Sequence, residues 1–290
     1  VRAIRAGAPD AIGAAAAQRR ARDLPGTGGG LLIVAADHPA RGALAVGAAP
    51  MAMGSRVELL RRLVIALSRP GVDGVLGTPD VLDDLLLMGA LEDKVVVGSM
   101  NRGGLTGAAF ELDDRFTAYD AGSIADAGFD AGKMLCRIDL ADRGSLATLT
   151  ACASAIDDLV AHGLIAMVEP FMATRRDGRV VNDLRPEAVI RSINIAQGLG
   201  ASSSHSWLKL PVLSEMDEVM AATTLPTLLL GGDPAGDQDQ AFASWEKALA
   251  APGVRGLIVG RSLLYPPGDD VANAVDTAAS LVHPPESRPS

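Results

Sequence analysis

The sequence predicts an α/β fold, a single (β/α)8 or TIM barrel, and three observations support this expectation. Short apolar runs alternate with longer amphipathic segments, and the alternation repeats eight times along the 290 residues. The apolar runs contain few polar residues, as expected for parallel strands that are buried on both faces. No break in composition separates the units, which favours one closed barrel over the alternative of an open doubly wound sheet.

The predicted elements follow one another in order. Strands are expected at residues 31–37, 74–77, 95–99, 132–139, 164–170, 207–212, 227–232 and 256–260. The segments between them carry apolar residues at intervals of three and four, which gives each helix one buried face. Some helices have a Pro or Gly boundary, as at Pro186 and Gly198. Within one domain, 1–290, we expect an N-terminal capping helix and connector (1–30), the barrel (31–282) and a frayed tail (283–290).

Three loop segments have different expected roles. The long segments 38–53 and 99–123 follow the first and third strands, so we expect both to form walls at the catalytic rim of the barrel. The glycine cluster at 26–30 precedes the first strand. It therefore cannot be a phosphate-binding turn between a strand and a helix, and we interpret it as a connector.

The charge of the chain excludes some partners. A net charge of −9 argues against nucleic acid, which requires a basic face. No apolar run approaches the ~20 residues of a membrane helix, and the first residues do not resemble a signal peptide. Two cysteines, Cys136 and Cys152, provide neither a disulfide framework nor a metal-binding spacing. These features predict a cytoplasmic protein that does not bind membranes.

A metal centre is not expected either. A zinc-dependent aldolase would need about three converging nitrogen or oxygen ligands. The four histidines do not form such a group by spacing; they are His38, His162, His205 and His283.

Lysine is rare in this chain, and its placement is informative. The 26 basic residues include four lysines, and Lys133 and Lys209 lie inside predicted strands four and six. A salt bridge to a carboxylate on a neighbouring strand would explain either lysine alone. Two lysines that face each other lower the pKa of one of them, so that part of it is neutral amine. Such an amine attacks a carbonyl carbon, which arginine cannot do because it stays protonated.

Two carboxylates are expected beside the lysines. Asp37 ends the first strand and Glu169 ends the fifth, so both side chains should point toward the C-terminal mouth of the barrel. An acid at the end of a strand is often a helix cap or a loop anchor. Asp37, however, precedes the polar loop His38–Gly42 instead of an obvious helix start. Carboxylates near an amine can perform the proton transfers of Schiff-base chemistry.

Five segments together resemble a known family. They are AADHPARG (35–42), GKMLCRID (132–139), VEPF (168–171), SWLKLPV (206–212) and GLIVGRSLLYP (256–266). In this order the chain resembles the class I, Schiff-base aldolases of the tagatose-bisphosphate and bacterial fructose-bisphosphate type, which are related to deoxyribose-phosphate aldolase. The resemblance covers residues 31–265, roughly from the first strand to the eighth.

The resemblance implies roles for four residues. Lys209 would form the Schiff base with Lys133 as its neighbour, Glu169 would transfer protons, and Asp37 would bind or protonate substrate. Deoxyribose-phosphate aldolase has a second lysine on strand seven, where this chain has TLLLGGD. That departure favours the tagatose-bisphosphate-like branch.

Phosphate and structural roles are predicted for the remaining polar residues. Loops after strands seven and eight of a barrel commonly bind phosphate, although their glycines can equally serve tight turns. The candidates here are Gly231, Gly232, Gly260, Arg261 and Ser262. Arg102 is a candidate for a second anionic group, and Arg137 is expected to pair with Asp139 or with an acid of another strand.

The predicted activity is that of an aldehyde-lyase that needs no cofactor and no metal. It would cleave a phosphorylated keto sugar or sugar acid, with 2-deoxy-5-keto-gluconate 6-phosphate of inositol breakdown, fructose or tagatose bisphosphate and deoxyribose 5-phosphate as candidates. A barrel isomerase or decarboxylase, and a noncatalytic barrel that binds sugar phosphates, are the alternatives. We also expect a homo-oligomer that associates through helical faces.

Overall fold

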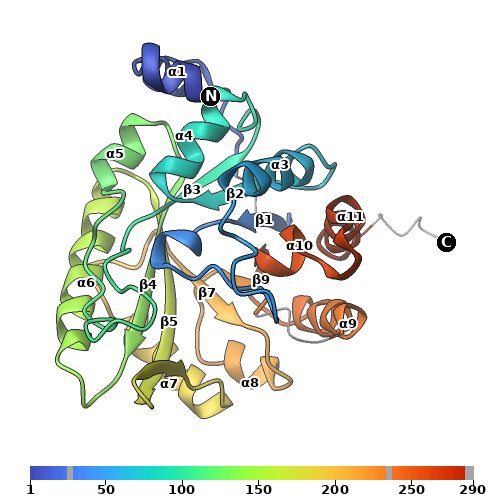
Figure 1. Cartoon of the computed structure of the whole chain (residues 1–290). Coiled ribbons are helices and arrows are strands. Elements are labelled where there is room, and N and C mark those ends of the chain that lie inside the picture. Colours follow the sequence, from blue (N-terminus) through green and yellow to red (C-terminus); the bar gives the residue numbers. More distant parts are fainter. Residues whose placement is uncertain (25–28, 233–236, 285–290) are drawn as a thin grey trace.

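The computed structural model describes residues 1–24, 29–232 and 237–284 (Figure 1). The predicted connector and the predicted tail therefore lie partly outside the described residues.

Eight parallel strands close into a barrel, which confirms the predicted fold (Figure 1). The strands are β1 (Leu31–Ala35), β2 (Gly74–Gly77), β3 (Val95–Ser99), β4 (Ala131–Ile138), β5 (Ile165–Arg176), β7 (Ser206–Pro211), β8 (Thr227–Leu230) and β9 (Val254–Val259). Their hydrogen-bonded order is β4-β3-β2-β1-β9-β8-β7-β5, and the pairing of β4 with β5 closes the barrel. The predicted strands correspond to these eight with small shifts at their ends, except that β5 extends to Arg176 where the sequence predicts an end at 170.

Helices surround the strands in Figure 1. They are α3 (Arg56–Leu67), α4 (Pro79–Leu87), α5 (Ala121–Asp126), α6 (Gly144–Ala161), α7 (Pro186–Ala196), α8 (Met216–Met220), α9 (Gln238–Leu249), α10 (Arg261–Leu264) and α11 (Val271–Val282), with short 3-10 turns at Pro39–Arg41 and Pro267–Asp269. None of the helices in the described part of the chain has the length and apolar character needed to cross a membrane.

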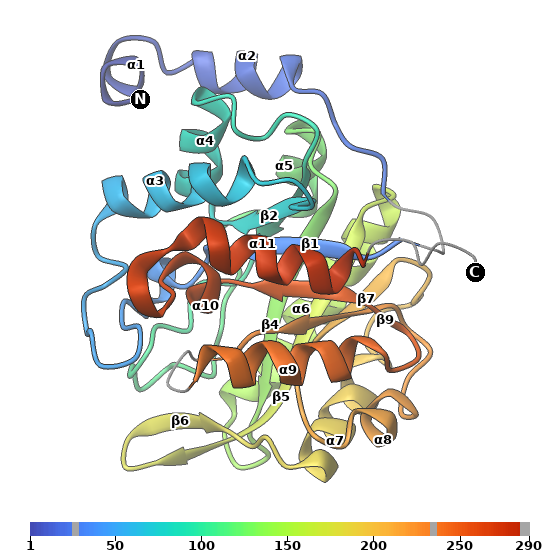
Figure 2. The same ribbon diagram turned by 90° about the vertical axis from the view of Figure 1, so that its right-hand side faces the viewer.

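The N-terminal region contains two short helices where the sequence predicts one. They are α1 (Arg2–Gly7) and α2 (Ala11–Gln18), and α2 packs beside α4 on the outside of the barrel (Figure 2). Neither helix has a buried residue. Partly buried Ile12, Ala15 and Ala16 of α2 pack against the core, and polar contacts add to this packing, such as Arg5 Nε to Asp84 Oδ1 at 2.7 Å and Arg19 Nη1 to the Lys94 carbonyl at 2.9 Å.

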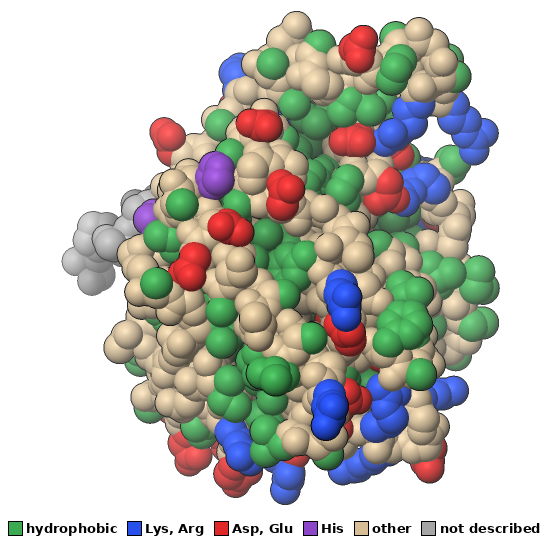
Figure 3. Space-filling view, turned by 90° about the vertical axis from the view of Figure 1, so that its left-hand side faces the viewer, with side chains coloured by type: hydrophobic (Ala, Val, Ile, Leu, Met, Phe, Trp, Pro, Cys, Tyr) green, Lys and Arg blue, Asp and Glu red, His purple; other side chains and the backbone are tan. Residues whose placement is uncertain are grey.

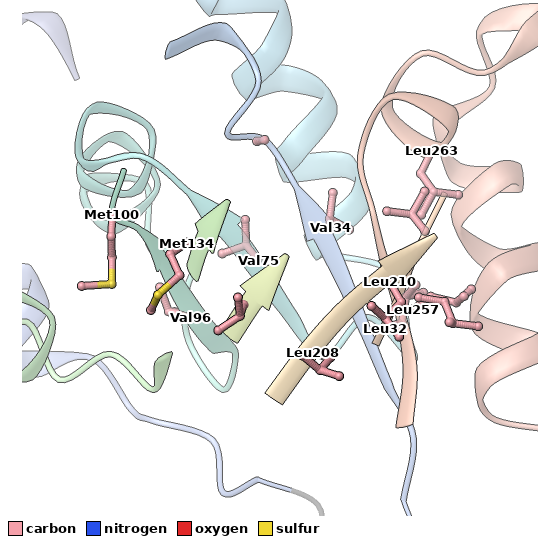
Figure 4. Packing of buried hydrophobic residues seen from close by; sticks show 14 of the residues in the cluster. Leu32, Val34, Val75, Val96, Met100, Met134, Leu208, Leu210, Leu257 and Leu263 are labelled. Atoms are coloured by element: carbon pink, nitrogen blue, oxygen red, sulfur yellow. The ribbon is translucent and has the colours of Figure 1, made fainter. Parts of the chain in front are cut away.

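Alternate residues of each strand face two different apolar layers. On β1, Leu31, Ile33 and Ala35 point into the barrel, whereas Leu32 and Val34 pack toward the helices. The outer layer is the larger one, and Figure 4 shows part of it around the strands. Both layers are made almost entirely of aliphatic side chains, as the low aromatic content of 3% requires.

The two-residue period of the strands places the polar residues. Above the inner apolar layer, the inward positions that follow Ala35, Ala131, Met167 and Trp207 are Asp37, Lys133, Glu169 and Lys209. Parallel strands all end at the same face of a barrel, so these four side chains are brought together at its C-terminal mouth. The inside of the barrel is therefore apolar below and charged above.

A β-hairpin at the rim was not predicted. Beyond the barrel, β5 continues and pairs antiparallel with β6 (Arg179–Asn182), and the hairpin projects from the lower left in Figure 2. Asp177 and Gly178 form the two-residue turn, with φ values of 48° and 76°. An Asp-Gly pair between two extended runs is a strong hairpin signal, so the sequence did contain the information.

The surface does not carry a large area of one charge on the face that Figure 3 shows. Acidic, basic and apolar side chains are interspersed there.

Gly256 is expected to be essential for closing the barrel between β9 and β1. Its φ is +125°, and a Cβ there would lie 2.1 Å from the Leu31 carbonyl oxygen. Gly256→Ala should lower the free energy of unfolding by ~2 kcal/mol or more because it adds both strain and a backbone clash. Denaturant unfolding followed by circular dichroism measures this change.

Gly122→Ala is the matched control. A Cβ added to this helical glycine would lie 3.7 Å from its nearest neighbour, Asp120 Oδ1, and the glycine does not have a positive φ. The substitution should be neutral or stabilise by up to ~1 kcal/mol. Equal effects at both positions would contradict the role assigned to Gly256.

Candidate active site

A cavity of about 380 Å³ opens at the C-terminal ends of the strands. Its wall includes all four residues predicted to be catalytic. The charged and polar side chains that line it are Asp37, His38, Arg41, Arg102, Lys133, Arg137, Glu169, Asn182, Lys209 and Arg261. The cavity is therefore located where barrel enzymes work.

The catalytic candidates form a chain of alternating charges. Lys209 Nζ lies 3.3 Å from Glu169 Oε1, and the other Glu169 oxygen pairs with Lys133. Lys133 Nζ also lies 3.1 Å from Asp37 Oδ2, which Arg102 contacts from the far side at 3.1 Å. All five side chains are buried. Lys133 is thus held by two carboxylates, whereas Lys209 lies at one end of this series of charges, which we call the charge chain.

Burial and neighbouring charges act in opposite directions on the two acids. Burial raises the pKa of Glu169, but Lys133 and Lys209 outweigh it and bring that pKa down to about 2. For Asp37, burial is likewise overcome by Lys133, Arg102 and Lys209, and its pKa lies well below the usual value. Both acids are therefore carboxylates at neutral pH.

Lys209 lowers the pKa of Lys133, as expected for two lysines that lie close together. Burial is the largest influence and lowers the pKa of Lys133, while Asp37 and Glu169 oppose this shift. Lys209 and Arg102 add to the lowering because like charges repel each other.

The predicted phosphate-binding residues lie together at one side of the mouth. Gly231, Gly232, Gly260 and Arg261 border the cavity, whereas Ser262 is buried outside its lining. Packing and backbone conformation also explain why glycine occurs at two of these positions. A Cβ on Gly260 would lie 2.4 Å from the Ala35 carbonyl oxygen, and Gly232 has a φ of +70°. Both interpretations made from the sequence are thus compatible at these positions.

The two arginines singled out from the sequence have carboxylate partners. Arg102 pairs with Asp37, so this guanidinium is already neutralised by the predicted strand-one acid. Arg137 pairs with Glu111, with 2.6 Å between Nη1 and Oε1. The prediction that Arg137 pairs with Asp139 or another strand's acid was wrong, because Glu111 belongs to the loop after β3.

Both long loops do form walls of the cavity, as predicted, and they contribute residues that sequence reasoning did not select. Arg41 follows β1, and its Nη1 lies 2.5 Å from Oδ2 of Asp114 in the loop after β3. This ion pair joins the two loops. His38 also lines the cavity, and its position beside Asp37 was visible in the sequence. Asn182, at the end of the unpredicted hairpin, and Leu184, which follows it, also line the cavity.

Metal ligands do not gather in the described part of the chain. Within residues 1–24, 29–232 and 237–284, no three His, Cys, Asp or Glu side chains are arranged to hold a metal ion.

Comparison with known proteins agrees with this architecture. A family model described as Cgl0159-like matches residues 29–279. The crystal structure of Cgl0159 from Corynebacterium glutamicum is 60% identical, with 97% of this chain and 95% of that one aligned and a TM-score of 0.95. None of the proteins with curated descriptions matches the sequence.

More distant structures share the barrel. An archaeal fructose 1,6-bisphosphate aldolase has a TM-score of 0.63 at 20% identity, covering 88% of this chain and 94% of its own. A fructose-bisphosphate aldolase from Slackia heliotrinireducens has a TM-score of 0.62 at 14% identity, covering 87% and 81%. At these identities the likeness shows the barrel fold alone.

Ionised Glu169 should stabilise the fold, and this contribution to the free energy of unfolding should be lost at acid pH. Its pKa of about 2 lies below the value of 4.5 expected in an unfolded chain. The stabilisation is therefore complete above about pH 4.5 and is lost as the pH falls toward 2, by an amount on the order of 3 kcal/mol. Chemical unfolding at several pH values measures this slope.

Glu169→Gln should flatten that slope between pH 2 and 5. Glu187→Gln is the control, because Glu187 is a surface acid in the first turn of α7. If the Glu169→Gln and wild-type proteins lose stability equally over this range, the charge chain does not stabilise the fold as we infer.

Proposed function

The chain belongs to the Cgl0159-like family, and we propose that it is a class I aldolase, an aldehyde-lyase that cleaves a phosphorylated keto sugar or sugar acid through a Schiff base on Lys209. The observation that carries this proposal is the buried pair of Lys209 and Glu169 at 3.3 Å, inside a cavity at the C-terminal mouth of a barrel. A primary amine beside a carboxylate, shielded from bulk water, is the arrangement that imine formation requires.

The contacts of the two lysines within this series of charges differ. Arg102, Lys133 and Lys209 carry three positive charges, and Asp37 and Glu169 carry two negative ones. Lys133 bridges both carboxylates, so we assign the reacting amine to Lys209, which contacts only Glu169 in the described charge chain.

Glu169 is suited to move the protons of imine formation. As a carboxylate it takes a proton from the Lys209 ammonium, and the free amine adds to the substrate carbonyl carbon. Glu169 returns this proton to the oxygen of the adduct and then transfers a second proton from the nitrogen to the same oxygen, which leaves as water and gives the iminium ion. Lys133 remains positive between Asp37 and Glu169 and keeps both acids oriented.

The iminium ion draws the electrons of the carbon–carbon bond. When that bond breaks, an aldehyde leaves and the remaining fragment becomes an enamine on Lys209. Protonation of the enamine carbon and hydrolysis of the imine then release the second product and restore the lysine.

The phosphate of the substrate would bind near Gly231, Gly232, Gly260 and Arg261. These residues border the cavity on the side of β8 and β9, where barrels commonly bind phosphate through backbone N–H groups. We retain 2-deoxy-5-keto-gluconate 6-phosphate, fructose and tagatose 1,6-bisphosphate and deoxyribose 5-phosphate as the candidate substrates.

Borohydride reduction tests the proposal directly. Wild-type protein incubated with each candidate and reduced should gain the mass of the reduced ketone or aldehyde fragment, and peptide mapping should locate it on Lys209. Lys209→Met should abolish both the adduct and cleavage, with a loss of activity of ~10⁴-fold or more because the covalent route is removed.

Lys133→Met and Lys247→Met complete the experiment. Lys247→Met changes a lysine in the last turn of α9 and should leave trapping unchanged. Lys133→Met should slow trapping while keeping the adduct on Lys209. An adduct on Lys133 would reassign the nucleophile, and the lack of any adduct with every candidate would remove the aldolase proposal.

A further inference from the structure

His38 has a position that the charge chain does not explain. It follows Asp37 directly and lines the cavity between the ends of β1 and β9. A Cβ added to Gly260 would come within 3.3 Å of the His38 Cε1 atom, so the glycine leaves room for the imidazole ring. The ring therefore lies between the acid Asp37 and the turn that we propose to bind phosphate.

One nitrogen of the His38 ring is enclosed by the protein. His38 Nδ1 is buried and has no hydrogen-bond partner among the described residues. Its nearest acid is Asp37, whose Oδ1 lies 3.7 Å away, slightly beyond hydrogen-bond distance. The Asp37 side chain contacts Lys133, Arg102 and Ser99 through Oδ2, and Arg102 also donates to the Asp37 carbonyl oxygen, so Oδ1 is left for the ring.

This arrangement favours one tautomer. A proton on Nδ1 would point toward Asp37 Oδ1, and a small closure of the gap would complete a hydrogen bond. The ring then presents Nε2 as an acceptor. Since 28% of the His38 side chain is exposed while Nδ1 is buried, the substrate would meet the part of the ring that carries Nε2.

The ring is neutral at physiological pH. Burial lowers the pKa of His38, and Arg261 and Lys209 add to this, whereas Asp37 and Glu169 oppose it; the result is about 4. A neutral imidazole can accept a proton, whereas the lysines and arginines around it are donors. Of the two carboxylates, Asp37 is engaged with Lys133 and Arg102, and Glu169 lies beside Lys209, where it is assigned the protons of imine formation.

From this geometry we infer that His38 is the base that accepts the hydroxyl proton of the substrate when the carbon–carbon bond breaks, with Asp37 as its positioning residue. The inference rests on the proposed function. Nε2 takes the proton of the hydroxyl on the carbon that is cleaved off, and the O–H electrons form the aldehyde C=O. The electrons of the broken carbon–carbon bond move to the iminium ion and give the enamine. Asp37 stabilises the imidazolium until it returns the proton.

The test separates imine formation from bond cleavage. Dihydroxyacetone phosphate has a ketone but no bond to cleave, so borohydride trapping with it reports imine formation alone. In His38→Asn and His38→Ala, the reduced adduct should form on Lys209 to the same extent as in the wild type. Their cleavage of the candidate sugar phosphates should fall by ~10²–10⁴-fold. Added imidazole should partly restore cleavage by His38→Ala, which a merely structural role would not allow.

His205→Asn is the matched control, since His205 precedes β7 and is absent from the cavity wall among the described residues. It should trap and cleave as wild type does. Cleavage at the wild-type rate by His38→Asn would overturn the inference, and so would an equal loss of trapping and cleavage in both His38 variants.

A second measurement keeps this inference distinct from the aldolase proposal. Glucitol 6-phosphate has hydroxyls and a phosphate but no carbonyl, so it cannot form an imine. Nitrogen NMR of wild-type protein should show the His38 proton on Nδ1, and glucitol 6-phosphate should shift the Nε2 resonance. If this shift occurs but no adduct forms with any carbonyl compound, the aldolase proposal fails, while the contact of His38 Nε2 with the ligand stands. A proton on Nε2, or no shift, would overturn the role of His38.

Discussion

The bridging of two carboxylates by one buried ammonium is the interaction on which the rest of the site depends. Lys133 lies between Asp37 and Glu169, and both acids stay ionised because of it. Without this central cation, two negative charges would face each other inside a barrel and at least one would take up a proton. Lys209 would then lose the carboxylate that contacts it. The central lysine thus sets the protonation state of two acids on other strands.

The barrel makes this arrangement possible through a simple constraint. Inward-facing residues alternate along every strand, and all eight strands end at one face. An apolar layer such as Leu31, Ile33 and Ala35 fills the interior below, which leaves the next inward position of each strand for chemistry. Burial of the charges follows from this geometry, and burial in turn strengthens each ion pair within the cavity.

The same constraint explains how much could be predicted from the sequence. The eight strands and the convergence of Asp37, Lys133, Glu169 and Lys209 were predicted because they depend only on strand periodicity and direction. The partner of Arg137 could not be predicted, since Glu111 lies in a loop whose path is set by tertiary contacts such as Arg41 with Asp114. The hairpin at Asp177–Gly178 was missed although its turn signal was present. His38 was noted as a neighbour of Asp37, but its room beside Gly260 depends on how β1 and β9 meet.

The protein as a whole and its cavity have opposite electrostatic character. The chain carries a net charge of −9, yet among the described residues that line the cavity six are Lys or Arg and two are Asp or Glu. The surface field repels an anionic ligand at long range, so attraction must come from groups that act over a few ångströms inside the cavity. Arg41, Arg102 and Arg137 each have a carboxylate partner, which limits how much of the local positive charge is available to a ligand. Selection of a substrate therefore depends on how its hydroxyls, carbonyl and phosphate fit these fixed pairs, and a neutral group such as His38 can distinguish hydroxyls that the ion pairs cannot.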